Sequence, residues 1–156
     1  MRWFPWVLSA ILALVIAAMA WMLVLRGQVR EGDDGRVSIL LSSGERNLVL
    51  AEMRGFLESV QEIVEAVPRG DLKAAEAAAR RVGRINLDDL PASLLRKLPG
   101  EVKRLGLDTH RKFYKLAGDI RQGMKREEIL PRLAGIMVNC TGCHAGYRLD
   151  VERGAR

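Results

Sequence analysis

The spacing of apolar residues after Ser42 constrains the fold of this chain more than any other feature. Between Ser42 and Pro68 the apolar positions recur at alternating steps of four and three, which places them on one helical face: Val49, Met53, Phe56, Val60, Ile63 and Val67. Ser42 and Glu45 have the spacing of a capping box that begins such a helix. We therefore predict an amphipathic first helix that ends before Pro68.

Three more segments have a helical pattern, and none shows the alternation of a strand. We predict these helices over 71–83, from 108 or 109 to 123, and over about 127–147, with one short helix, 91–97, in the connection 85–100. Pro131 is expected in the first turn of the last helix or at a kink. The predicted fold class is all-α, an antiparallel up-down-up-down four-helix bundle preceded by one transmembrane helix.

The transmembrane prediction rests on Trp6 to Leu25, a run of 20 residues without a charge. At about 1.5 Å per residue, this run spans a hydrocarbon core of roughly 30 Å. Residues 18–20 have the A-x-A pattern of a signal-peptide cleavage site, but the apolar run continues beyond them. We predict a signal anchor (or signal peptide) at 1–26, a linker at 27–43 whose residues 37–41 pack on the domain, the four-helix domain at 44–150, and a tail at 151–156.

Charge is unevenly distributed along the chain, which carries a formal net charge of +6. Between Arg69 and Arg132 there are 16 Lys and Arg residues against 9 Asp and Glu residues. This surplus suits an acidic partner or anionic lipid headgroups, or forms a solvated helix surface. We do not expect nucleic acid as a partner, because the basic stretch has few stacking aromatics beyond Phe113 and Tyr114.

The two cysteines of the chain lie in the sequence "NCTGCHAGYRL", at the end of the last predicted helix. Cys140, Cys143 and His144 have the C-x-x-C-H spacing of covalent c-type haem attachment, in which two thiols bond the macrocycle and the imidazole binds the iron. A redox dithiol is expected at a helix start instead, a zinc site would have to recruit His110, and a disulfide three residues apart in a helix is strained. One covalent haem c with its iron is the predicted cofactor.

The stretch "CTGCHAGYR" resembles the haem motif of the class II c-type cytochromes, the cytochrome c′ family. The resemblance covers about residues 42–149, with "ERNLVLAEMRGFLESVQEIVEAV" similar to the family's first helix. It implies thioether attachment at Cys140 and Cys143 and His144 as the proximal metal ligand. The membrane segment, the Gly-rich linker and Pro131 depart from the family pattern.

The sixth iron position separates the functions that the resemblance implies. A methionine ligand on the first helix is typical of electron carriers, and an apolar residue there is typical of proteins that bind nitric oxide or carbon monoxide. Met53 is our candidate ligand, because it lies on the core face near the start of the first helix, and its alternative role is core packing. His110 is expected near the level of Val138, about 9 Å short of His144, bonded to a propionate or a carbonyl.

Two other residues complete the predicted cofactor site. Phe56 is expected in the core or against the haem, and Arg148 is expected to offset a propionate charge or to be solvated. We predict a non-enzymatic electron carrier of the bacterial inner membrane with its haem domain in the periplasm. Membrane-associated redox proteins are the expected partners, and a homodimer is possible. The alternatives are a five-coordinate gas-binding protein and an assembly factor that uses the cysteines as a dithiol.

Overall fold

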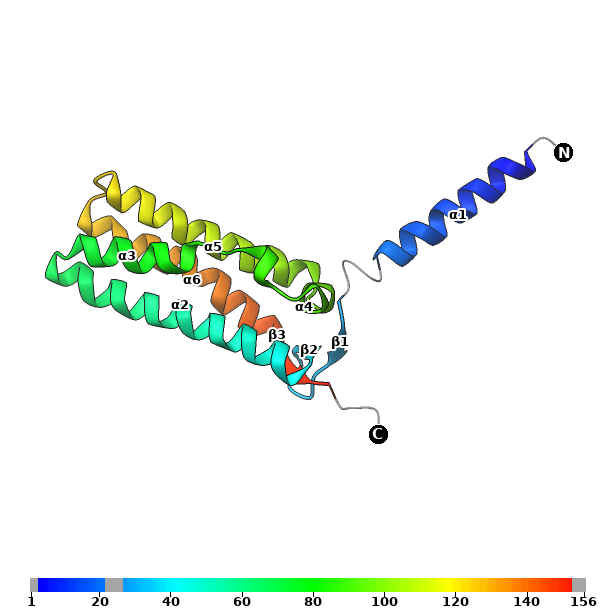
Figure 1. Ribbon diagram of the computed structural model, residues 1–156, viewed down its shortest axis with the longest axis horizontal. Coiled ribbons are helices and arrows are strands. Elements are labelled where there is room, and N and C mark those ends of the chain that lie inside the picture. The colour runs from blue at the N-terminus through cyan, green and yellow to red at the C-terminus, as the bar shows by residue number, and fades with distance from the viewer. Residues whose placement is uncertain (1–2, 22–26, 153–156) are drawn as a thin grey trace.

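A computed structural model describes residues 3–21 and 27–152, and this part of the chain is mainly helical, as predicted (Figure 1). Six α-helices are described: α1 (Phe4–Ala20), α2 (Ser43–Arg69), α3 (Leu72–Gly83), α4 (Ala92–Lys97), α5 (Gly100–Arg121) and α6 (Arg126–Gly146). A short 3-10 turn, Leu87–Asp89, precedes α4. Three strands complete this part of the chain: β1 (Val29–Glu31), β2 (Val37–Leu41) and β3 (Tyr147–Val151).

The first helix, α1, contains most of the uncharged run that was predicted to span a membrane. Among residues 3–21 and 27–152, no helix is both long and apolar enough to cross a bilayer. The predicted span, Trp6 to Leu25, continues into residues 22–25, which lie outside the described part.

Four helices pack around one apolar core. In Figure 1, α2 and α5 run away from the sheet, and α3 and α6 run back toward it. Phe113, Leu116 and Leu133 are at most 2% exposed in this core, as expected for the apolar faces of amphipathic helices. A close approach sets α3 against α5, since a Cβ added at Gly83 would lie 2.5 Å from the Tyr114 amide nitrogen.

The helix boundaries largely follow the predicted signals. The capping box at Ser42 and Glu45 is present, with the Glu45 amide donating to Ser42 Oγ over 3.2 Å and the Ser42 amide to Glu45 Oε2 over 2.9 Å. The predicted cap at Asp71 is also present, accepting from the Ala74 amide over 3.0 Å.

Two boundary predictions were wrong. The third long helix begins at Gly100, not at residue 108 or 109, because Pro99 stands at its N-cap, where proline is compatible with a helix start. Helix α2 continues past Pro68 to Arg69 and ends at Gly70, which has the left-handed φ of 75°. Of the two alternatives for Pro131, the first turn is excluded, because Pro131 lies further inside α6; the kink stays a prediction.

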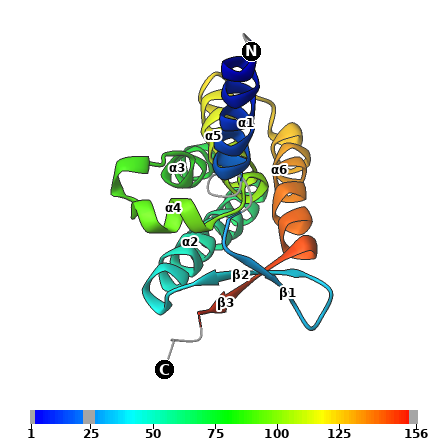
Figure 2. The same cartoon turned by 90° about the vertical axis from the view of Figure 1, so that its right-hand side faces the viewer.

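A small three-stranded sheet was not predicted. Its strand order is β1-β2-β3, with β1 antiparallel and β3 parallel to β2 (Figure 2). Residues expected to be a linker therefore pair with the segment that follows α6, and Val151 and Glu152 extend this pairing into the expected tail. The apolar patch 37–41 does pack on the domain, because Ile39 and Leu41 are buried with Leu94.

Candidate functional site

The C-x-x-C-H segment forms the last turns of α6, immediately before β3. Cys140 and Cys143 are half-buried free thiols, three residues apart and therefore on one side of the helix. His144 follows on the exposed side of the same turn. Burial raises the pKa of both thiols, and the nearby Cys140 and Glu101 raise that of Cys143 further.

One side-chain contact sets the antiparallel register of α2 against α6, and a second joins α2 to β3, the strand that follows α6. Arg46 Nε donates to the Leu149 carbonyl over 3.3 Å at one end, and Arg126 Nη2 donates to the Pro68 carbonyl over 2.8 Å at the other. Counted along the two helices from the Arg126–Pro68 contact, Met53 lies fifteen residues before Pro68, and Thr141 lies fifteen residues after Arg126. The register thus places Met53 at the level of the C-x-x-C-H segment.

Met53 also lies between two apolar clusters. Val49, one turn before it, packs on the small cluster beside the sheet, and Phe56, nearly one turn after it, packs on the main core. Met53 shares their helix face but belongs to neither cluster, and it is half-buried. On α6 the cysteines have the same relation to the two clusters, with Ile136 in the main core and Tyr147 beside the sheet.

Two contacts fix the register of α5 against α6. Asn139 Nδ2 donates to Asp108 Oδ2 over 2.9 Å and to Thr109 Oγ1 over 3.2 Å. The Tyr147 hydroxyl donates to Glu101 Oε2 over 2.7 Å, and this bond, together with burial, raises the pKa of Tyr147 to about 12. Both contacts agree with a register in which His110 is level with Val138, as the sequence analysis predicted.

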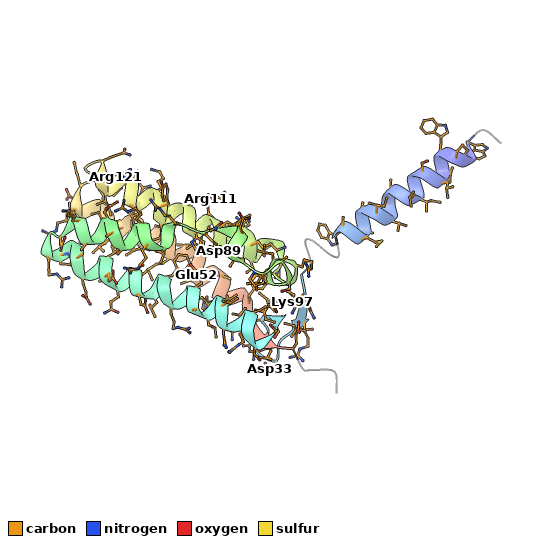
Figure 3. The ribbon with its side chains drawn as sticks, viewed as in Figure 1. Asp33, Glu52, Asp89, Lys97, Arg111 and Arg121 are labelled. Atoms are coloured by element: carbon orange, nitrogen blue, oxygen red, sulfur yellow. The ribbon has the colours of Figure 1, made fainter. Side chains whose placement is uncertain are left out.

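The environment of His110 confirms that a backbone carbonyl satisfies it. Its side chain is 5% exposed, and Nδ1 lies 2.6 Å from the Val82 carbonyl oxygen, so Nδ1 must carry the hydrogen. Nε2 lies 3.7 Å from Glu52 Oε1 on α2 (Figure 3). The ring also contacts Phe56, with their centroids 4.8 Å apart.

The two remaining predicted site residues lie on opposite sides of the motif. Phe56 contacts Phe113, with ring centroids 5.4 Å apart, and thus reaches the main core. Arg148 lies on β3, where it pairs with Asp33, Asp34 and Asp150. These acidic residues of the hairpin and of β3 offset the charge of Arg148.

The geometry fits covalent haem attachment in several respects. The cysteines are free and half-buried, they belong to neither apolar cluster, and the His144 ring has no hydrogen-bond partner within the described residues. Within that same part of the chain, no three His, Cys, Asp or Glu side chains are grouped to hold a metal ion.

Comparisons with protein-family models, with curated proteins and with solved structures find no match for this chain.

The sequence did not indicate which residues of other elements contact the C-x-x-C-H segment and its neighbours. Asn139 bonds Asp108, 31 positions away, and Glu101 bonds Tyr147, 46 positions away. Arg36 bonds the His144 carbonyl, 108 positions away. The glycines at 32 and 35 were visible as a turn signal, but nothing local indicates which residues that turn contacts.

Proposed function

We propose that this protein is a monohaem c-type cytochrome of the class II kind that transfers single electrons. In this proposal α2, α3, α5 and α6 form the up-down-up-down bundle, Cys140 and Cys143 hold the haem through thioether bonds, and His144 and Met53 bind its iron. The bound haem would supply a reversible one-electron couple of iron. The protein would fix the axial ligands and limit access of water.

The observation that carries this proposal is the register between α2 and α6. It gives Met53 the level of Thr141, between the two cysteines, and the packing leaves Met53 outside both apolar clusters. A methionine that served only to fill the core would be expected inside one of them. The main core on one side and the sheet cluster on the other would flank the ring and keep water from its faces.

The supporting residues have separate tasks in this proposal. Phe56 and Phe113 present aromatic surface to the main-core side of the site. His110 stays with the Val82 carbonyl and is not an iron ligand. Asn139 joins α6 to α5 one residue before Cys140, so it helps to hold the haem-bearing segment at its level.

The proposed location is the periplasmic side of a bacterial inner membrane. Its support is the uncharged run Trp6 to Leu25, which is followed by a domain with an export-dependent cofactor motif. An anchor of this kind would raise the local concentration of the domain near membrane-bound redox partners. The net charge of +6 would favour partners with an acidic surface.

A second candidate function is reversible binding of carbon monoxide or nitric oxide. The same Met53 environment supports it, because Met53 is half-buried and belongs to neither apolar cluster. A small ligand would then displace the thioether, or the sixth position would remain open.

Covalent attachment is the first test of the proposal. We expect the full-length chain, expressed with a c-type maturation system, to keep its haem through denaturation and acidic acetone extraction. Cys140→Ser and Cys143→Ser should each lose one thioether bond, which changes the reduced pyridine haemochrome spectrum. A wild-type chain with no Soret band and two titratable thiols would overturn the proposal in favour of the dithiol alternative.

A further inference from the structure

The hairpin that precedes α2 contacts the C-x-x-C-H segment directly. Arg36, which lies between Gly35 and β2, donates from Nη1 to the His144 carbonyl oxygen over 3.3 Å. This carbonyl is one of the last four of α6, which lack an amide partner within the helix. Arg36 therefore caps the C-terminus of α6 at the predicted iron ligand and places a positive charge at the negative end of the helix dipole.

Asp34 holds the Arg36 guanidinium in place. Its Oδ2 accepts from Arg36 Nε over 2.9 Å and from Nη2 over 2.6 Å, and its Oδ1 accepts from the Arg36 amide over 3.1 Å. These hydrogen bonds lower the pKa of Asp34 to about 2. The two bonds from Oδ2 orient the guanidinium, and the third fixes the backbone that carries it.

The hairpin is also fixed to the strand that follows α6. Val37, the residue after Arg36, is the register partner of Tyr147, three residues after His144. Arg148 on β3 pairs with Asp33 and Asp34 at the hairpin tip, where Figure 3 labels Asp33. The tip itself requires glycine, because a Cβ added at Gly32 would lie 2.5 Å from the Arg36 carbonyl oxygen.

We infer that Arg36 is a positioning residue for His144 and that the β1–β2 hairpin is a clasp on the haem-bearing end of α6. This inference rests on the proposed function and adds to it a determinant of the reduction equilibrium. The guanidinium fixes the backbone of the proximal ligand and adds a positive charge beside it. That charge favours the reduced iron, which carries one positive charge less than the oxidised iron.

The test compares two substitutions that remove the same charge from the same hairpin. Arg36→Gln removes the contact to His144, whereas Arg30→Gln removes an arginine of β1 whose ion pair is with Asp150, 3.6 Å away. The measurement is the reduction equilibrium constant of the full-length holoprotein against a redox dye of known potential. We expect Arg36→Gln to shift this constant about two- to five-fold toward the oxidised form, the range of one charge at a helix terminus.

Two further variants separate position from charge. Arg36→Lys keeps the charge and should recover most of the shift. Asp34→Asn keeps Arg36 but removes the carboxylate paired with it, so it should shift the constant in the opposite direction, toward the reduced form. Equal shifts for Arg36→Gln and Arg30→Gln, or no shift in either, would overturn the inference.

Hydrogen exchange of the chain without haem distinguishes a failure of this inference from a failure of the proposed function. The amides of the last turn of α6 should exchange faster in Arg36→Gln than in Arg30→Gln, because only the first variant loses the cap. Unchanged exchange would overturn the inference that the hairpin stabilises the end of α6, whether or not the chain carries haem. If the chain never binds haem but shows this difference in exchange, the role of the hairpin at α6 is supported and the cytochrome proposal is refuted.

Discussion

Substitution of Lys97 by methionine tests the polar cluster that joins the sheet to the helices. Lys97 lies at the end of α4 (Figure 3), and its Nζ is 2.7 Å from both Glu45 Oε2 and Glu152 Oε1. The Glu45 side chain is only 8% exposed and also accepts the Ser42 amide in the capping box. Removing the ammonium therefore leaves a buried carboxylate without its main partner.

The pKa of Glu45 gives the size of the effect. The hydrogen bond from Lys97 is the largest cause that lowers this pKa from 4.5 to about 2, with smaller contributions from Ser42 and Ser93. At roughly 1.4 kcal/mol per pKa unit, the whole shift corresponds to about 3 kcal/mol. We assign the larger part to Lys97 and expect Lys97→Met to lower the free energy of unfolding by about 2 kcal/mol at pH 7.

The pH dependence has a defined sign. Because the folded-state pKa of Glu45 lies below its ordinary value, this stabilisation is present above pH 4.5 and is lost as the pH falls toward 2. Between these values the variant should lose less stability than the wild-type protein does. Urea unfolding followed by far-ultraviolet circular dichroism at pH 7 and pH 3 measures both effects.

The matched control is Lys73→Met, which removes an exposed lysine from α3. We expect it to change the free energy of unfolding by less than about 0.5 kcal/mol. If Lys97→Met were no more destabilising than this control, or followed the wild-type pH dependence, the cluster would not stabilise the fold as argued.

Three other predictions concern the core and the thiols. Phe113→Ala should lower the free energy of unfolding by about 3 to 5 kcal/mol, because the ring is 1% exposed, whereas Tyr114→Ala, at a 54% exposed residue, should cost far less in the same urea titration. Asn139→Ala should cost about 1 to 3 kcal/mol, because it removes a buried amide that donates to Asp108 and Thr109 on α5; a neutral result would show that water replaces the amide. Without haem, Cys140 and Cys143 should react with iodoacetamide at pH 8 more slowly than in the urea-unfolded chain, because burial raises their pKa; equal rates would contradict this.

The helical part of the fold was predictable because its signals are local. The apolar spacing between Val49 and Val67, the capping box at Ser42 and the cap at Asp71 depend on residues within a few turns of one another. The sheet was not predictable in this way. Strand β2 has five residues, and its parallel partner β3 begins more than a hundred positions later, so no short window of the sequence contains the pair.

The candidate site also combines features set by neighbouring residues with features set by distant ones. The C-x-x-C-H spacing and the position of Met53 on a helix face follow from neighbouring residues, and the level of His110 follows from helix lengths. The contact of Arg36 with the His144 carbonyl depends on how the hairpin pairs with β3, and that pairing depends on tertiary packing. Arg148 illustrates the difference, since its neighbours in the motif suggested a cofactor contact and its strand partners are acidic residues of the hairpin.

The coordination of the iron is the central claim of this account. The most direct test is the visible absorption spectrum of the full-length holoprotein, oxidised and reduced, for the wild type, Met53→Ala and Met124→Ala. Met124 packs on the main core at the opposite end of α6, so its substitution is a matched control for the loss of a thioether. We predict a low-spin wild type with the far-red charge-transfer band of methionine ligation, its loss only in Met53→Ala, and binding of carbon monoxide by that reduced variant. A high-spin wild type that binds carbon monoxide at once, with a spectrum indifferent to both substitutions, would contradict ligation by Met53 and favour the gas-binding function.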